Sequence, residues 1–358
     1  MKSILIVKTS ALGDVVHTLP VLHYLRSRFP KARIDWVVEK GSVDFLSAQP
    51  FLDRAIAINT KAWRKGKQWK EIRAFFRTLR ETKYDAVFDL QGNFKSALIT
   101  LCAKAKDKVG FGFYSVPEKP NLLATNQRFE VPTGINVRAR YLHVVQSYFN
   151  DPVPFIEHPV SAAREKQPKI MVCFGSKWPN KQLSAQTWKA FLHRVAEETG
   201  YPFVFIWGDE KEKTAADELQ RAFSGSSETL GGMALLEWQQ RMGEMTAVIA
   251  VDSMGLHLCG LTDTPTFGVF GPSSSAVYQP LGASHGAFQA ACPYGIKFTE
   301  RCPRLRSCAT GACLKELGSE KLAAAFITWW RAGRSSGVFP QHQSLLSPSP
   351  RLPCTVSP

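Results

Sequence analysis

The sequence of 358 residues lacks several features that would place it in a familiar class. It has no apolar run of the roughly 18 residues that a membrane-spanning helix requires. Its N-terminal apolar run of about five residues is too short for a secretion signal. No G-x-G-x-x-G follows a predicted strand, and neither G-x-x-x-x-G-K-[ST] nor G-x-S-x-G occurs. These absences argue against the usual dinucleotide, P-loop and serine-hydrolase sites, and they favour a cytoplasmic protein.

Acidic residues are also scarce. The chain has 30 Asp and Glu against 45 Lys and Arg, a net charge of +15, and no acidic residue follows Glu320. Such a surface suits nucleic acid, an anionic membrane or a phosphorylated substrate. Residues 61–70 carry five positive charges and no acid, so a nucleic-acid-binding protein is one alternative. No RNA-binding or helix-turn-helix signature accompanies this run, and a solvated helix face explains it. We therefore expect no nucleic-acid partner.

The eight cysteines do not form a familiar framework. A chain of this length without a secretion signal has no need of disulfides, so reduced thiols are expected. Four cysteines nevertheless fall in one stretch: Cys292, Cys302, Cys308 and Cys313. A zinc site is the alternative there, but the spacings are not those of ordinary zinc modules. We expect no metal.

Apolar β-branched runs alternate with amphipathic helical segments along most of the chain. This alternation predicts an α/β protein with parallel sheets covered on both faces. A proline-rich interval near the middle separates two such series. The sequence therefore predicts two Rossmann-like domains that face a cleft, with a linker and a Pro/Ser-rich disordered tail. The predicted bounds are 1–150 and 169–332 for the domains, 151–168 for the linker and 333–358 for the tail.

The first candidate site follows the first predicted strand, in "LIVKTSALGDVV". Ligands of open α/β sheets bind at the carboxyl ends of the strands. Thr9, Ser10 and Gly13 form a small, amide-rich loop before a predicted helix, which is typical of anion or sugar binding. Asp14 in this loop can accept a proton from a substrate hydroxyl. The alternative is structural, with Gly13 turning the chain and Asp14 interacting with the helix dipole.

A second candidate site lies in "VIAVDSMGLHLCG", where a strand gives way to a helix. Asp252, Ser253, Gly255 and His257 combine backbone amides, a hydroxyl and an imidazole, which suit a diphosphate. The alternative is a capped helix that contains a packed histidine.

A third candidate site follows the strand that ends at Phe174. Lys177 and Lys181 lie in the next loop, and a lysine there can place its charge on a phosphate leaving group. The alternative is that both lysines are solvated.

The order of motifs resembles glycosyltransferase family 9, the bacterial lipopolysaccharide heptosyltransferases, and is closest to the members that add the first heptose to the inner core. The opening "ILIVKTSALGDVVHTLP" and "VDSMGLHL" at 251–258 are the most specific matches. Supporting matches are "DWVVEKG", "WRK", "YDAVFDLQGNFKSA", Lys181 before "QLSAQTW", and "WGDEKE". The likeness covers about residues 1–330. It implies a GT-B fold and inverting, metal-independent transfer from a nucleotide-activated heptose, with no cofactor.

The resemblance also implies roles for individual residues. Asp14 would be the catalytic base, and Lys181 would stabilise the leaving diphosphate. The implied donor-binding residues are Ser176, Lys177, Glu212, Met233, Asp252, Ser253, Gly255 and His257. The implied acceptor-binding residues are Thr9, Ser10, Gly13, Arg64, Lys65 and Gln91. The acceptor would be an anionic, lipid-linked saccharide (Kdo-lipid A), reached by peripheral electrostatic contact with the inner leaflet of the inner membrane.

The sequence departs from the family pattern in two places. The family reads Asp-Thr/Ser-Gly where this chain has Asp252-Ser253-Met254, with the glycine one place later at Gly255. Residues 106–135, where the family shapes acceptor recognition, match poorly. A family 9 enzyme with a different nucleotide sugar or acceptor is therefore the alternative, ahead of a GT-B epimerase.

Overall fold

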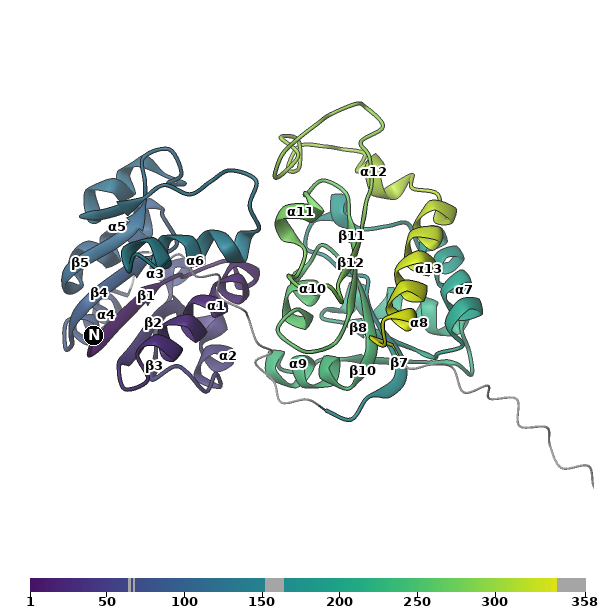
Figure 1. The fold of residues 1–358 in the computed structure, drawn as a ribbon, viewed down its shortest axis with the longest axis horizontal. Helices are drawn as coiled ribbons and strands as arrows, with labels where there is room; N and C mark the ends of the chain where they lie inside the picture. Colours follow the sequence, from purple (N-terminus) through teal and green to yellow (C-terminus); the bar gives the residue numbers. More distant parts are fainter. Residues whose placement is uncertain (64–65, 67, 152–163, 340–358) are drawn as a thin grey trace, which may run out of the picture.

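The computed structural model describes residues 1–63, 66, 68–151 and 164–339 of the chain. They form two α/β domains, each built on a six-stranded sheet in which all paired strands are parallel. Figure 1 shows the domains side by side. The predicted fold class, with two Rossmann-like sheets facing each other, is confirmed.

The N-terminal domain has the strand order β3-β2-β1-β4-β5-β6. Four of the five residues of β1 are fully buried because helices cover both faces of the sheet. The strands are β1 (Ser3–Val7), β2 (Arg33–Glu39), β3 (Arg54–Ile58), β4 (Lys83–Asp89), β5 (Lys104–Phe111) and β6 (Gln127–Phe129). The helices are α1 (Leu12–Arg28), α2 (Val43–Ser47), α3 (Thr60–Trp63), α4 (Trp69–Leu79), α5 (Phe94–Cys102) and α6 (Val137–Tyr148), with short 3-10 turns η1 (Lys40–Ser42) and η2 (Lys119–Ala124).

The C-terminal domain repeats this topology with the order β12-β11-β10-β7-β8-β9. The strands are β7 (Gln167–Cys173), β8 (Phe203–Trp207), β9 (Ser227–Gly231), β10 (Met245–Val251), β11 (Thr266–Phe270) and β12 (Gly286–Gln289). The helices are α7 (Ala185–Thr199), α8 (Glu210–Ala222), α9 (Leu235–Gly243), α10 (Met254–Cys259), α11 (Ser275–Tyr278), α12 (Ala312–Lys315) and α13 (Ser319–Ser335), with the 3-10 turn η3 (Pro179–Lys181). In both sheets the strand order reverses beside the first strand, and such switch points are where ligands bind.

The domains meet through α1 and α6 on one side and α10 on the other (Figure 1). Arg138 of α6 is buried and donates to two carbonyl oxygens at the end of α10, those of His257 and Gly260, each at 3.0 Å. The last carbonyls of a helix have no partner within the helix and attract a cation. Arg138 therefore fixes α10 against the N-terminal domain.

The structure corrects some predicted boundaries. The predicted tail from 333 begins too early, because α13 continues to Ser335 and Phe339 is buried, stacked on Trp330 with ring centroids 4.1 Å apart. The predicted linker ends slightly too late, since β7 begins at Gln167. Residues 152–163 and 340–358 lie outside the described part of the chain. Within the described part, no helix is both long enough and apolar enough to cross a membrane.

Candidate active site

The three predicted sites follow strands at the two switch points. Asp14 follows β1, and its neighbour in the sheet is β4, which ends just before Gln91. Lys181 follows β7, and its neighbour β10 ends just before Asp252. The carboxyl ends of parallel strands lie at one edge of a sheet, so each sheet presents two loops to the cleft.

On the N-terminal side, the loop before α1 is held by side-chain hydrogen bonds. The side-chain oxygen of Gln91 accepts from the backbone N–H groups of Thr9 at 3.0 Å and Ser10 at 3.1 Å. Asp14 lies in the first turn of α1, and its Oδ2 accepts from the N–H of Ala11 at 3.1 Å. Its other carboxylate oxygen has no hydrogen bond within the described part of the chain. Asp14 thus uses one carboxylate oxygen to accept from the N–H of Ala11 at the start of α1. Its other oxygen is available to a substrate.

The position of Gln91 depends on a buried carboxylate behind it. Asp89 accepts from the backbone N–H groups of Gln91 at 3.1 Å and Gly92 at 2.9 Å, and from the side chains of Asn121 at 2.7 Å and Thr100 at 3.0 Å. Burial raises the pKa of Asp89, and these hydrogen bonds oppose the rise. The network makes the end of β4 a rigid support for the Asp14 loop.

Lys8, the residue after β1, is buried beside this loop. Its Nζ donates to the carbonyl oxygen of Leu90 at 3.0 Å and to the hydroxyl of Tyr141 at 2.9 Å. Burial lowers the pKa of Lys8 to about 8, against the opposing charges of Asp14 and Asp89. A cation with little access to water is thus retained close to Asp14.

The lowered pKa of Lys8 predicts that the stability of the protein depends on pH. Between about pH 8 and pH 10.5 the unfolded chain holds a proton on Lys8 that the native state has released, so the free energy of unfolding rises with pH. The rise should reach roughly 3 kcal/mol, and a Lys8→Met variant should lack it. Urea titrations of both proteins from pH 7 to pH 10 measure the difference. Parallel curves would contradict the lowered pKa of Lys8.

On the C-terminal side, three charged or polar groups form one buried cluster. Nζ of Lys181 lies 2.5 Å from Oδ2 of Asp252, and Nε2 of His257 lies 3.2 Å from Oδ1. Burial alone would raise the pKa of Asp252, but the hydrogen bond of His257 and the charge of Lys181 outweigh it and hold this pKa below its usual range. Asp252 is therefore ionised, and it orients both the lysine and the histidine.

The two sides meet at His257. A Cβ atom on Gly13 would lie 3.6 Å from its Cδ2. The ring of His17, one turn after Asp14 on α1, lies 4.1 Å from the ring of His257 between centroids. Burial, then the neighbouring His257 and Arg138, lower the pKa of His17 well below its usual value, so this ring packs uncharged. The structure thus brings the Asp14 loop and the Asp252 cluster together across one cleft.

The other predicted donor residues surround the end of β7. Glu212 of α8 accepts from the N–H of Gly208 at 2.8 Å and lies against Gly175, where an added Cβ would come within 2.0 Å of its Oε1. A larger residue at position 175 would displace the carboxylate of Glu212 from this loop. Ser176 is half-buried in the same loop, whereas Lys177 is exposed and forms no ion pair within the described residues. The structure thus brings Lys181, not Lys177, to Asp252.

The displaced glycine of the second motif has a packing explanation. At Gly255, an added Cβ would lie 3.1 Å from the Cβ of Cys173 and 3.1 Å from Cζ2 of Trp238. Met254, in the preceding position, is the first residue of α10 and is partly buried, and Ser253 is the N-cap residue, with no side-chain capping hydrogen bond. Met233 is likewise partly buried against the same core. Among the described residues no hydrogen bond uses the hydroxyl of Ser253, while α10 packs closely on Trp238.

Two further groups of predicted residues remain: the basic pair Arg64 and Lys65, and the cysteines that follow β12. Arg64 and Lys65 lie outside the described residues. Burial, and then the neighbouring Cys292, Cys308 and Cys302, raise the pKa of Cys313 to about 11. The described cysteines are all free, and within the described part no three His, Cys, Asp or Glu side chains are arranged to hold a metal ion. Elemental analysis for zinc distinguishes the two alternatives.

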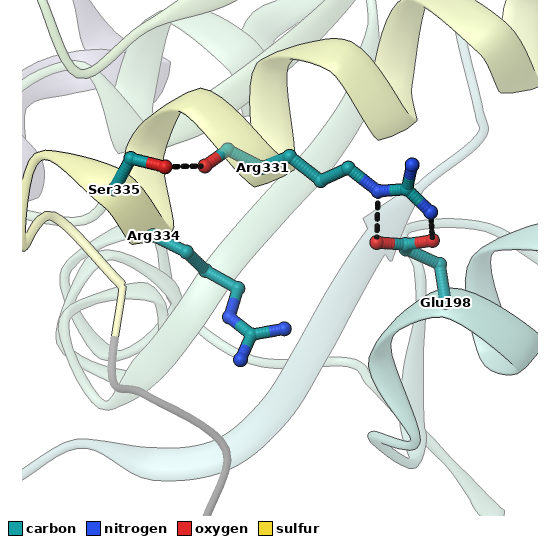
Figure 2. Close-up of a pocket in the computed structure, with 4 residues that line it drawn as sticks. All are labelled: Glu198, Arg331, Arg334 and Ser335. Atoms are coloured by element: carbon teal, nitrogen blue, oxygen red, sulfur yellow. Dashed lines mark hydrogen bonds and ion pairs between the residues drawn. The ribbon is translucent and has the colours of Figure 1, made fainter.

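A surface hollow of about 470 Å³ lies on a different part of the C-terminal domain, between α7 and α13. Figure 2 shows that Arg331 pairs with both carboxylate oxygens of Glu198, at 2.8 and 2.6 Å, beside Arg334. None of its lining residues belongs to the cleft. The hollow lies away from both switch points, and its one carboxylate is paired with Arg331, so it does not compete with the cleft as a candidate site.

Sequence reasoning missed three groups that the structure places at the cleft: Lys8, His17 and Arg138. A signal existed for His17, since it lies three residues after Asp14 and therefore on the same face of α1. Lys8 directly follows a buried strand at the predicted ligand edge. No local pattern distinguishes Arg138 from the solvated arginines of a helix.

Two Rossmann-like domains with ionisable groups at both switch points of a shared cleft are typical of the GT-B class of proteins. The model of the family described as glycosyltransferase family 9 (heptosyltransferase) matches residues 72–306, more than half of the chain. The chain belongs to glycosyltransferase family 9, and it is a glycosyltransferase.

Individual relatives agree with this assignment. Lipopolysaccharide heptosyltransferase 1 of Pseudomonas aeruginosa is 28% identical over 78% of this chain and 82% of its own length. The protein of the same name from Escherichia coli K12 is 26% identical over 78% of this chain and 91% of its own length. The E. coli heptosyltransferase WaaC solved with ADP has a similar fold, with a TM-score of 0.77 at 23% identity over 91% of this chain and 99% of that chain.

Proposed function

We propose that the protein transfers heptose from ADP-heptose to the inner core of lipopolysaccharide, with Kdo-lipid A as the acceptor. The observation that carries this proposal is the juxtaposition of the Asp14 loop with the Lys181–Asp252–His257 cluster across one cleft. Relatives named lipopolysaccharide heptosyltransferase 1 support the sugar and the pathway. A similar structure that contains ADP-2-deoxy-2-fluoro heptose, at 25% identity and a TM-score of 0.71, supports the donor.

The proposed reaction is a single displacement with inversion at the anomeric carbon. Asp14 takes the proton of the acceptor hydroxyl through the carboxylate oxygen that Ala11 leaves free. The acceptor oxygen forms its bond to the anomeric carbon as the bond from that carbon to the diphosphate oxygen breaks. ADP leaves with the electron pair. A base on one wall and a cation on the other suit attack from the face opposite the leaving group.

Lys181 would stabilise the negative charge that develops on the leaving diphosphate. Its ammonium group is held by Asp252 before substrate binds, so little reorganisation is needed during the reaction. Ser176, Ser253 and His257 would complete the contacts to the diphosphate and the sugar, and Glu212 and Met233 those to the nucleoside. With this cation in place, we propose that the reaction requires no metal ion and no cofactor.

The acceptor side of the proposal rests on the Asp14 loop. Thr9, Ser10, Gly13 and Gln91 would contact the acceptor saccharide, and Arg64 and Lys65 its anionic groups. The net charge of +15 suits peripheral contact with the anionic inner leaflet of the inner membrane.

A product assay tests this function. The purified chain is offered ADP-heptose, and separately UDP- and GDP-activated hexoses, with Kdo-lipid A in buffer that contains EDTA. We expect heptosylated Kdo-lipid A and free ADP from the first mixture alone, with the new linkage of inverted configuration. Transfer from another nucleotide sugar would instead favour a family 9 enzyme with a different donor. Loss of transfer in EDTA would contradict metal independence.

A further inference from the structure

One arginine in the segment after β12 reaches the cleft from the C-terminal domain. The segment around Arg301 is clamped to the loop after β11: Ser273 and Arg301 form an antiparallel bridge. The N–H of Ser274 donates to the carbonyl oxygen of Glu300, and the N–H of Cys302 donates to that of Pro272, each at 2.8 Å. The backbone of Arg301 is therefore held in place although the segment is otherwise irregular.

The side chain of Arg301 is positioned without being neutralised. Its guanidinium carbon lies 4.6 Å from the centre of the Tyr278 ring. Within the described residues, no carboxylate lies within ion-pair distance of this guanidinium and no side-chain hydrogen bond uses its N–H groups. An aromatic ring beneath a guanidinium restricts its orientation and leaves its edge available. Arg301 is thus an oriented cation with all its donors free.

This cation lies on the Asp14 side of the cleft. The ring centroid of Tyr278 is 6.4 Å from that of His17, which follows Asp14 by one turn of α1. The neighbouring Glu300 pairs with Arg140 of α6, so the same segment contacts the N-terminal domain. Tyr278 is buried, and burial raises its pKa; the charges of Arg301 and Arg140 oppose this rise, and those of Glu300 and Asp14 add to it. These charges therefore surround one buried phenol.

Three cations lie near Asp14, namely Lys8, Arg140 and Arg301. Nζ of Lys8 already donates to Leu90 and Tyr141. Arg140 already forms an ion pair with Glu300. The charge of Arg301 remains uncompensated. A guanidinium with its N–H edge free binds a carboxylate or phosphate through two parallel hydrogen bonds. A cleft that will receive a saccharide next to a negatively charged base gains from such a group, since it fixes an anionic substituent at a defined distance from the reacting hydroxyl.

We propose that Arg301 binds an anionic group of the acceptor, a carboxylate or a phosphate, and thereby selects acidic saccharides and orients their hydroxyl toward Asp14. The inference rests on the proposed function and adds a residue of the C-terminal domain to acceptor recognition. The acceptor is then held between the domains, with Asp14 on one and Arg301 on the other. Neutral saccharides of similar size lack this contact.

The test compares Arg301→Ala and Arg301→Lys with the unmodified chain. De-O-acylated Kdo-lipid A is the probe, and it is used intact, as the methyl ester of the Kdo carboxylate, and after removal of the lipid A phosphates. Calorimetry in the presence of ADP gives the Kd of each probe, and transfer assays give KM and kcat. Arg304→Ala is the matched control, because it removes an exposed arginine from the same segment.

We expect Arg301→Ala to raise Kd and KM for the intact probe about 10- to 100-fold, with a smaller effect for Arg301→Lys and none for Arg304→Ala. The modified probe that lacks the recognised group should bind the unmodified chain and Arg301→Ala equally. If that probe is the methyl ester, Arg301 binds the carboxylate; if it is the dephosphorylated one, Arg301 binds a phosphate. Equal Kd of the unmodified chain and Arg301→Ala for the intact probe would overturn the inference. Absence of transfer by the unmodified chain contradicts the proposed function instead, and the binding comparison still applies.

Discussion

Replacing Asp14 by Asn is expected to lower the rate of heptose transfer by about 10²- to 10⁴-fold. The substitution removes the proton acceptor but keeps a side-chain oxygen that can accept from the N–H of Ala11, as Oδ2 of Asp14 does at 3.1 Å. The start of α1 should therefore remain intact. The Kd of ADP should change less than about twofold, because a general base acts in the transition state rather than in donor binding.

A matched control separates this role from a purely structural one. Asp44 is another first-turn carboxylate of the N-terminal domain, on α2, and it is exposed. Asp44→Asn should leave both transfer and the melting temperature unchanged. If Asp14 only capped α1, Asp14→Asn would keep near-normal turnover, while Asp14→Ala would lower the melting temperature. Single-turnover measurement of heptose transfer beside ADP calorimetry distinguishes the two roles.

The positions of Asp14, Lys181 and Asp252 could be predicted because each follows a strand that is buried on both faces. Such strands are nearly continuous apolar runs, and the parallel arrangement places their carboxyl ends at one edge. The edge strands β9 and β12 carry a weaker sequence signal for the opposite reason. Both are short, and β9 reads "SETLG", with polar residues in place of a buried apolar run. An edge strand buries too little to impose an apolar pattern.

The contacts between the domains could not be predicted in the same way. Arg138 and Gly260 are 122 residues apart in the chain, and nothing local in either segment indicates the other. The same holds for Phe339, whose burial depends on Trp330 and the end of α13. Gly255 likewise packs against the distant Cys173 and Trp238, 3.1 Å from where its Cβ would lie, and no local pattern indicates either neighbour. Close packing between distant segments leaves no periodic signal in the sequence.

The Lys181–Asp252 ion pair is the second contact with a large expected effect. Lys181→Ala leaves the carboxylate of Asp252 buried, and His257, at 3.2 Å, is then its one side-chain partner among the described residues. Loss of one partner of a buried pair costs about 3 to 5 kcal/mol of stability. The pKa of Asp252 should rise toward or above its usual range, since burial favours the neutral acid. ADP affinity and transfer should fall together, because the same cation binds the diphosphate and stabilises the leaving group.

A double variant separates stability from chemistry. Lys181→Ala combined with Asp252→Asn removes both charges, so much of the lost free energy of unfolding should return while ADP affinity and transfer remain low. Lys169→Ala is the control, because it breaks an exposed pair with Glu228 on the same domain and should cost at most about 1 kcal/mol. Urea unfolding, ADP calorimetry and transfer assays on the four proteins give the comparison. If the double variant recovered transfer along with stability, Lys181 would serve only to neutralise Asp252, and the leaving group would have to be stabilised by another residue of the cleft.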